Sequence, residues 1–328
     1  MDLGLAVAGL FVGVVVGLTG MGGGALMTPV LVLFFGVQPL AAVSSDLVAS
    51  AVMKPLGGFV HLRRGTVNLE LVKWLMIGSV PAAFAGVLVL RWLGDGESVQ
   101  QVVKVSLGIA LFVAAASLIG KSYLQLAERA RRRASGTARS SEQSGRPDVI
   151  ARPVATVLVG ALGGLIVGMT SVGSGSLIII ALLALYPTLQ ASQLVGTDLV
   201  QAVPLVASAA IAHMFFGDFH LEVTASLLIG CLPGVYVGAQ LSSRAPGGIV
   251  RRALSLVLLA SALKLVGAST SVTVAVLAAV MLAGPPLWAW ARVRHGFPPF
   301  ARRRIRVARP KLPEDDGARR TSLRGGSP

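Results

Sequence analysis

The chain has 328 residues, of which 54% are hydrophobic and only 13% are charged, and its mean hydropathy is +0.77. A soluble protein has about a quarter of its residues charged, so this composition excludes most soluble classes and indicates a membrane protein. The net charge of +15 does not indicate nucleic-acid binding, because the basic residues lie in gaps between apolar runs, as topology signals do.

Eleven apolar runs approach the length that a helix needs to cross a bilayer, about 20 residues. We interpret the run that begins after Asp2 as a retained first span, since no basic residues precede it as they would in a signal peptide. The sequence therefore predicts an all-α polytopic membrane protein with ten or eleven transmembrane helices. The runs are 3–18, 25–37, 46–62, 70–92 and 101–120, then 153–169, 176–187, 197–215, 222–242 and 249–267, and finally 272–291.

Two polar segments divide these runs into domains. Residues 121–152 are rich in Ser and Arg and should form a mobile cytoplasmic linker, and the basic tail 292–328 should be disordered or lie on the membrane surface. The expected transmembrane parts are a first repeat over 1–120, a second repeat over 153–270 and an additional span over 271–291.

The two groups of five runs repeat each other in sequence. At an offset of 151, Gly22 and Gly24 align with Gly173 and Gly175, and one inserted residue later Asp46, His61 and Pro81 align with Asp198, His213 and Pro233. Five spans are an odd number, so the second repeat should be inverted relative to the first, as in many secondary transporters. If the short runs 25–37 and 176–187 were both re-entrant, the halves would instead be parallel.

The distribution of Lys and Arg predicts the orientation. With the amino terminus outside the cell, 24 of the 29 basic residues fall in cytoplasmic segments, in agreement with the positive-inside rule. We therefore expect a multi-pass protein of the cell membrane with a cytoplasmic linker and carboxyl terminus.

A glycine-rich break between the first two runs of each repeat is the most informative motif. Glycines at these positions should interrupt the helix, and the following helix is too short to span the bilayer, so its amino end can lie at depth and bind an anion. Scattered glycines such as Gly78, Gly86, Gly230 and Gly238 are instead typical of close helix packing. The predicted substrate-binding residues are Thr19, Gly22, Gly23 and Gly24 with Thr170, Gly173, Ser174 and Gly175.

Charged and hydroxyl residues inside the apolar runs are the other candidates. Asp46 and Asp198, preceded by Ser45 and Thr197, could cap helices or couple transport to a proton or cation. Lys54 could neutralise an anion, or its side chain could extend to the lipid headgroups. Lys264 should extend to the headgroups in the same way or pair with a neighbour.

Sequence features of other functional classes are missing. The single cysteine, Cys231, permits no disulfide framework or CxxC metal site, and inverted repeats would separate His61 from His213 too widely to share a metal. No HExxH motif, nucleophile elbow or Walker loop occurs. We therefore predict no metal, no cofactor and no enzyme activity.

The duplicated motif, GLTGMGGGALMTPVL followed by SSDL and GMTSVGSGSLI followed by GTDL, resembles the TauE/SafE sulfite-exporter family of membrane transporters. The resemblance covers roughly residues 5–270. It implies a bacterial inner-membrane carrier of sulfite, a sulfonate or another organosulfur anion. The two copies of the motif differ at two positions that bear on substrate identity: the second copy has Ile180 where the first has Pro29, and Ser174 where the first has Gly23.

These observations favour a secondary transporter of a small anion that works by alternating access between the two repeats. A passive anion channel is the main alternative, and a membrane scaffold or intramembrane enzyme is a third. The expected partners are the anion and the bilayer, including anionic lipid at the basic linker and tail, but no nucleic acid.

Overall fold

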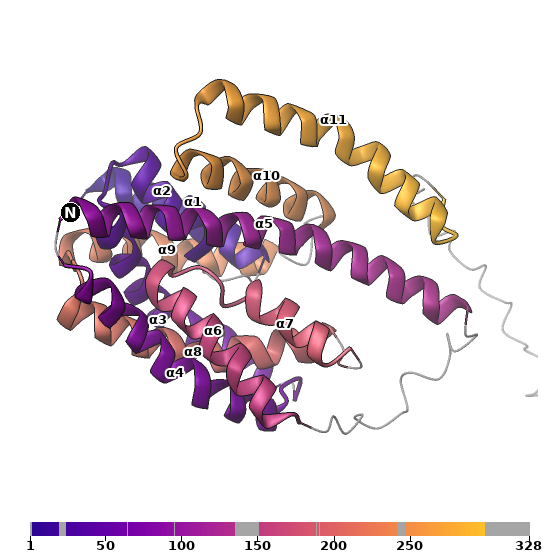
Figure 1. Cartoon of the computed structure of the whole chain (residues 1–328), viewed down its shortest axis with the longest axis horizontal. Coiled ribbons are helices and arrows are strands. Elements are labelled where there is room, and N and C mark those ends of the chain that lie inside the picture. The colour runs from indigo at the N-terminus through magenta and orange to yellow at the C-terminus, as the bar shows by residue number, and fades with distance from the viewer. Residues whose placement is uncertain are drawn as a thin grey trace, which may run out of the picture.

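The computed structural model describes residues 2–19, 24–63, 65–94, 96–134, 151–187, 189, 191–241 and 247–298, and these residues form helices and short connections without strands (Figure 1). Six of the helices are long and apolar enough to cross a membrane, and α1 and α2 are shorter apolar helices. The protein is thus an all-α polytopic membrane protein. The helices in the described residues are α1 (Leu3–Thr19), α2 (Gly24–Phe34), α3 (Pro39–Arg63), α4 (Leu69–Trp92), α5 (Glu97–Ala134), α6 (Pro153–Thr170), α7 (Leu177–Leu185), α8 (Ala191–Phe216), α9 (Leu221–Leu241), α10 (Gly247–Leu265) and α11 (Thr270–Arg294).

Three helices differ from the predicted runs. Helices α3 and α8 begin at Pro39 and Ala191, about two turns before the apolar runs 46–62 and 197–215. Helix α5 continues to Ala134, so the prediction of a mobile linker from residue 121 is wrong for its first part, where Leu, Ala, Gln, Glu and Arg favour helix. Of the predicted linker 121–152 and the predicted tail 292–328, residues 135–150 and 299–328 lie outside the described residues.

The first two helices of each half form an antiparallel hairpin. Gly4 in α1 lies beside the Phe35 ring that follows α2, so α2 returns to the end of the bundle where α1 begins. In the second half, the Arg152 backbone N–H donates to the hydroxyl of Tyr186 at 2.7 Å, so α7 returns to the end where α6 begins. We call these the amino-terminal end and the linker end.

The two hairpins enter the bundle from opposite ends. The start of α3 contacts the start of α5 through Leu40 N–H and Gln100 Oε1 at 3.0 Å, whereas the connection after α3 contacts α8 near its start through Asn68 N–H and Thr197 Oγ1 at 3.1 Å. Helices α3 and α8 therefore run in opposite directions beside each other. The second half is inverted relative to the first, and the alternative of parallel halves is wrong because each short helix returns to the end where its hairpin began.

Glycines allow the hairpins to pack closely on the opposite half. An added Cβ at Gly164 of α6 would lie 2.7 Å from the Cα of Ser79 in α4, and one at Gly234 of α9 would lie 3.0 Å from the backbone N of Val14 in α1. Gly78, Gly86, Gly230 and Gly238 meet backbone in the same way, which confirms their predicted packing role. The helix pairs α1–α9 and α4–α6 thus join the halves reciprocally.

Each short helix is enclosed by its own hydrophobic cluster. Met27 and Leu31 of α2 are buried in the cluster that includes α1, α5, α9 and α10, and Ile178 and Leu182 of α7 are buried in the cluster that includes α3, α4, α6 and α8. This enclosure allows a helix to begin at membrane depth, because protein rather than lipid surrounds the broken backbone.

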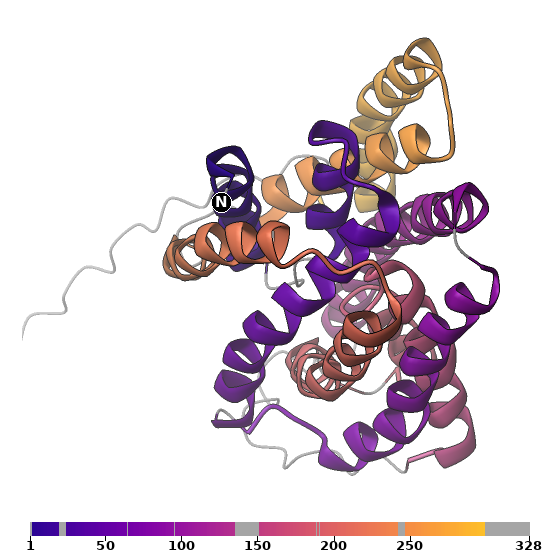
Figure 2. The ribbon, with the colours of Figure 1, turned by 90° about the vertical axis from the view of Figure 1, so that its left-hand side faces the viewer.

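Helix α11 lies outside this arrangement. In Figures 1 and 2 it extends along the outer side of α10, away from the hairpins. Only 6% of its apolar window is buried inside the protein, against 39 to 50% for the other five long spans.

Candidate functional site

The amino ends of the two short helices meet between the halves. Helix α2 begins at Gly24, where an added Cβ would lie 2.9 Å from Ser171 Oγ, so no side chain fits there. Ser171 itself follows α6 and precedes α7. Both short helices run outward from this meeting point, so their positive dipole ends face the centre of the molecule.

The connection between α6 and α7 is a tight turn that requires unusual backbone angles. Gly173 and Gly175 have φ angles of +131° and +111°, which glycine adopts without strain, and Ser171 has φ +58°, the only non-glycine positive φ in the described residues. The carbonyl of Gly173 accepts hydrogen bonds from the backbone N–H groups of Ser176 and Leu177 at 3.3 and 3.0 Å. The glycine motif therefore shapes the start of α7.

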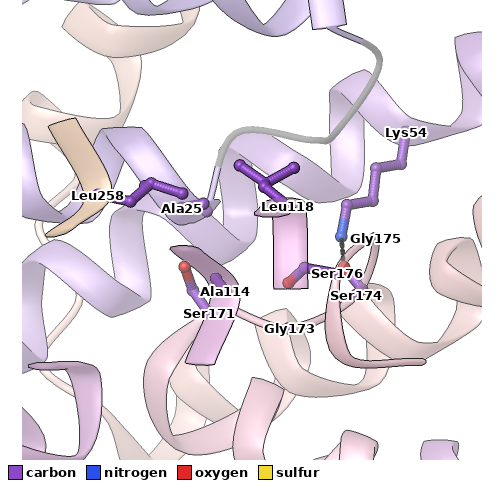
Figure 3. A pocket seen from close by; sticks show the side chains of 11 residues that line it. Ala25, Lys54, Ala114, Leu118, Ser171, Gly173, Ser174, Gly175, Ser176 and Leu258 are labelled. Carbon is purple, nitrogen blue, oxygen red and sulfur yellow. Dashed lines mark hydrogen bonds between the residues drawn. The ribbon is translucent and has the colours of Figure 1, made fainter. Parts of the chain in front are cut away.

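A small cavity lies where these ends meet (Figure 3). Lys54 reaches it from α3, is 6% exposed, and donates from Nζ to Ser174 Oγ at 2.5 Å. The cavity volume is about 10 Å³, which is room for about one water molecule. Its lining comprises Gly24, Ala25, Lys54, Ala114, Leu118, Ser171, Gly173, Ser174, Gly175, Ser176 and Leu258.

Asp46 connects the halves beside this cavity. Its Oδ2 accepts hydrogen bonds from Thr28 Oγ1 at 3.1 Å and from Ser171 Oγ, and the two hydroxyls are 3.1 Å apart. Thr28 belongs to α2, whereas Ser171 belongs to the other half. The Oδ1 atom of Asp46 and the hydroxyl of Ser45 are buried without a hydrogen-bond partner, which leaves unused polar capacity at this point of the site.

Asp198 has different partners. Its Oδ1 accepts from Gln201 Nε2 at 3.3 Å, and Gln201 Oε1 accepts from Ser79 Oγ at 3.2 Å. Thr197, the preceding residue and also a candidate from the sequence, accepts a hydrogen bond from the Asn68 backbone N–H through its hydroxyl. Asp198 therefore belongs to an amide and hydroxyl network between α4 and α8. Lys54 is close enough to interact electrostatically with the carboxylates of both Asp46 and Asp198.

The structure separates the alternatives for the acidic pair and the lysines. Asp46 and Asp198 lie about two turns inside α3 and α8, so the helix-capping interpretation is wrong for both. The buried Lys54 points into the cavity and not toward the headgroups. Lys264 is bonded to Thr270 Oγ1 at 2.7 Å, in agreement with pairing.

The predicted substrate-binding residues fall into three groups. Gly24, Gly173, Ser174 and Gly175 line the cavity together. Thr170 is buried nearby, but its hydroxyl bonds to the backbone of Ile166 at 2.6 Å and does not line the cavity. Gly22 and Gly23 lie outside the described residues, as does the side chain of Thr19.

Sequence reasoning missed Thr28, Ser171 and Ser176 as parts of this region. The hydroxyls of Thr28 and Ser171 face Asp46, and Ser176 lines the cavity. The repeat offered no signal for Thr28, whose aligned residue is Ile179. A signal for Ser171 was present in the sequence. It aligns with Gly20 of the first motif, so the second copy has a polar side chain where the first has no side chain.

The histidines lie far from each other along the bundle. His213 Nδ1 is 2.8 Å from Ser44 Oγ and its Nε2 is 2.8 Å from the Gly168 carbonyl oxygen, near the end of α8. His61 is near the linker end and its Nδ1 is 2.9 Å from Thr66 Oγ1. Both rings thus support local packing of helix ends.

Comparisons with known proteins agree with this architecture. The model of a family described as sulfite exporter TauE/SafE matches residues 5–265. The chain is 37% identical over 267 residues to the probable membrane transporter protein YjnA of Bacillus subtilis, covering 81% of this chain and all of that protein. It is 23% identical over 246 residues to the probable membrane transporter protein YdhB of the same organism, covering 74% and 91%. No solved structure matches the chain.

Proposed function

Because the chain belongs to the sulfite exporter TauE/SafE family of membrane transporters, we propose that it is a secondary transporter of a small anion, namely sulfite, a sulfonate or another organosulfur anion. The observation that carries this proposal is the convergence of two helix amino ends and one buried lysine on a single cavity between the halves. Backbone N–H groups and a dipole favour an anion, and Lys54 adds a full positive charge.

The site residues have distinct roles in this proposal. Gly24, Gly173 and Gly175 leave the backbone accessible to an oxyanion at the cavity, where Ser174 supplies a hydroxyl. Thr170, whose hydroxyl is bonded within its own helix, positions the turn before α7. Thr19, Gly22 and Gly23 are the matching candidates that the sequence offers in the first half. Lys54 neutralises the anion, and the anion replaces Ser174 Oγ as its hydrogen-bond partner. Sulfite and a sulfonate group each have three oxygens that such donors can bind together.

Transport would follow from the opposite entry of the two hairpins. The hairpin α1–α2 closes the cavity toward the amino-terminal end, and α6–α7 closes it toward the linker end, so rocking of one half against the other exposes the site to each side in turn. The cavity has room for about one water molecule and is too small for an anion to pass through, which favours a carrier over a continuously open channel.

In this proposal, Asp46 and Asp198 couple transport of the anion to a proton or cation. Asp46 is bonded to both halves through Thr28 and Ser171, so binding a cation or proton there would change how the halves are held together. Ser45 and Thr197 flank the pair, and Asp198 is the second candidate. We also propose that the linker and tail are cytoplasmic and that the amino terminus lies outside the cell membrane, since the basic residues of the linker and tail favour this orientation.

The test is uptake of radiolabelled sulfite, sulfoacetate and sulfate into proteoliposomes, with and without an imposed pH gradient. We expect saturable flux and counterflow for one of these anions, and loss of both with Ser174→Leu, which fills the cavity. Ala283→Leu on the exposed side of α11 adds the same volume elsewhere and should leave flux intact. Flux that does not saturate would favour a channel, and folded protein without flux of any sulfur anion would overturn the substrate class.

A further inference from the structure

A second, larger cavity lies between α5, α10 and α11, apart from the central site. It measures about 540 Å³ and its wall is mostly apolar, with Leu118 and Leu126 from α5 and Met281 from α11. It therefore forms an intramembrane groove that hydrocarbon chains could fill. Leu118 also lines the central cavity, so the two cavities adjoin at this residue of α5.

Both arginines of the groove lie at one end of it. Arg252 is in the second turn of α10 and Arg292 is in the last turn of α11, both at the linker end, and Trp288 lies one turn from Arg292 with the Arg252 guanidinium 5.9 Å from its ring. Arg292 Nε donates to the Pro298 carbonyl at 2.8 Å, which leaves its other N–H groups for a ligand. No carboxylate of the described residues forms a salt bridge with either guanidinium.

The dimensions of the groove agree with one leaflet. Along α11 its lining extends from Val280 to Arg292, which corresponds to about 18 Å at 1.5 Å per residue, against about 15 Å for half the hydrocarbon layer. Tryptophan and arginine mark the interface at the linker end, and the remaining wall is apolar. A ligand with an anionic head and long hydrocarbon chains matches this distribution of charge and apolar surface.

We propose that this groove binds one anionic phospholipid from the leaflet at the linker end, with its phosphate on Arg252 and Arg292 and its acyl chains along α5, α10 and α11. The basic tail is excluded as the occupant by charge, because residues 299–328 contain nine Lys or Arg and three acidic residues. The groove depends on α11, which lies beyond the family match at 5–265. It is therefore a property of this chain that the matched region alone would not have.

The test uses the full chain, purified in detergent and analysed by native mass spectrometry after titration with phosphatidylglycerol or phosphatidylcholine. We expect one phosphatidylglycerol to bind about 30-fold more tightly than phosphatidylcholine, which is equivalent to about 1 kcal/mol for each of the two arginines. The double variant Arg252→Ala/Arg292→Ala should remove this preference. Arg294→Ala, which changes the charge of the same helix end outside the groove, should keep it.

A second variant tests the groove itself. Gly284 lines it and an added Cβ there would meet no atom within 4 Å, so Gly284→Leu should fill the groove without disturbing the fold and weaken binding of both lipids. Ala283→Leu is the matched control and should bind as the wild type does. Equal binding of the two lipids, equal loss with Arg294→Ala, displacement by glycerol phosphate, or a dimer that Gly284→Leu dissociates would each overturn the proposal.

Discussion

The two halves of the protein share a backbone plan but differ in the chemistry of their central residues. Asp46 is bonded to two hydroxyls from opposite halves, whereas its repeat mate Asp198 is bonded to an amide of its own helix. Lys54 aligns with Val206. The comparison teaches that both halves contribute a hairpin to the centre, while among the described residues the positive charge at the central cavity comes from one half.

Replacing Lys54 should lower anion flux more than any other substitution that compares the two halves, because it removes the charge that distinguishes them. Among the described residues, Lys54 is the only cation that lines the central cavity. Lys54→Gln removes it, so we expect anion flux in proteoliposomes to fall about 100-fold, equivalent to about 2.7 kcal/mol. Lys54→Arg should retain part of the flux, because it keeps the charge but not the compact ammonium.

Lys264→Gln is the matched control for this prediction. Lys264 also lies in α10, but it does not line the cavity and is bonded to Thr270 at the end of the helix, six residues beyond the cavity-lining Leu258. If both glutamine variants lowered flux equally, the loss would reflect a general need for basic residues, and Lys54 would lose its role as the counter-charge.

The packing glycines should sharpen the comparison by showing where the halves are equivalent. Gly164→Ala and Gly234→Ala each place a Cβ within 3.0 Å of backbone in the opposite half, so each should lower the free energy of unfolding by about 1–3 kcal/mol. Thermal unfolding in detergent, followed by circular dichroism, measures both.

Gly284→Ala provides the reference for the glycine series, because an added Cβ there meets no atom within 4 Å. It should leave the melting temperature unchanged or raise it, since alanine favours helix. Unequal losses for Gly164→Ala and Gly234→Ala would contradict the equivalence of the α4–α6 and α1–α9 contacts.

The acidic pair should respond unequally to the same substitution. Asp46→Asn replaces the carboxylate that joins both halves, so we expect about a tenfold loss of flux and loss of its dependence on an imposed pH gradient, whereas Asp198→Asn should retain that dependence. Uptake at matched substrate concentration, with and without the gradient, compares them. Full, gradient-dependent flux with both variants would end the coupling proposal.

The sequence predicted the helices well because apolar runs and glycine breaks act locally. The extra turns at Pro39 and Ala191 were missed since small and polar residues there, such as Ser44 and Gly196, do not register as a membrane span, although protein contacts bury them. The positions of Gly24, Gly173 and Gly175 in one cavity followed from the repeat and the charge distribution. The hydrogen bond from Lys54 to Ser174 could not be predicted from the sequence, because it depends on how α3 crosses the turn between α6 and α7.

The hydroxyl of Thr28 offers the smallest and most specific test of the asymmetry. Its repeat mate is Ile179, so Thr28→Val makes the two short helices alike at this position while keeping the volume of the side chain. Ser171 still donates to the same Asp46 oxygen, so we expect only about a threefold loss of flux, less than the full value of a hydrogen bond to a charged group. Thr28→Ser keeps the hydroxyl and should transport as the wild type does. If the serine variant lost as much flux as the valine variant, the methyl contact and not the bond to Asp46 would be what α2 contributes, and the link between the halves would then rest on Ser171 alone.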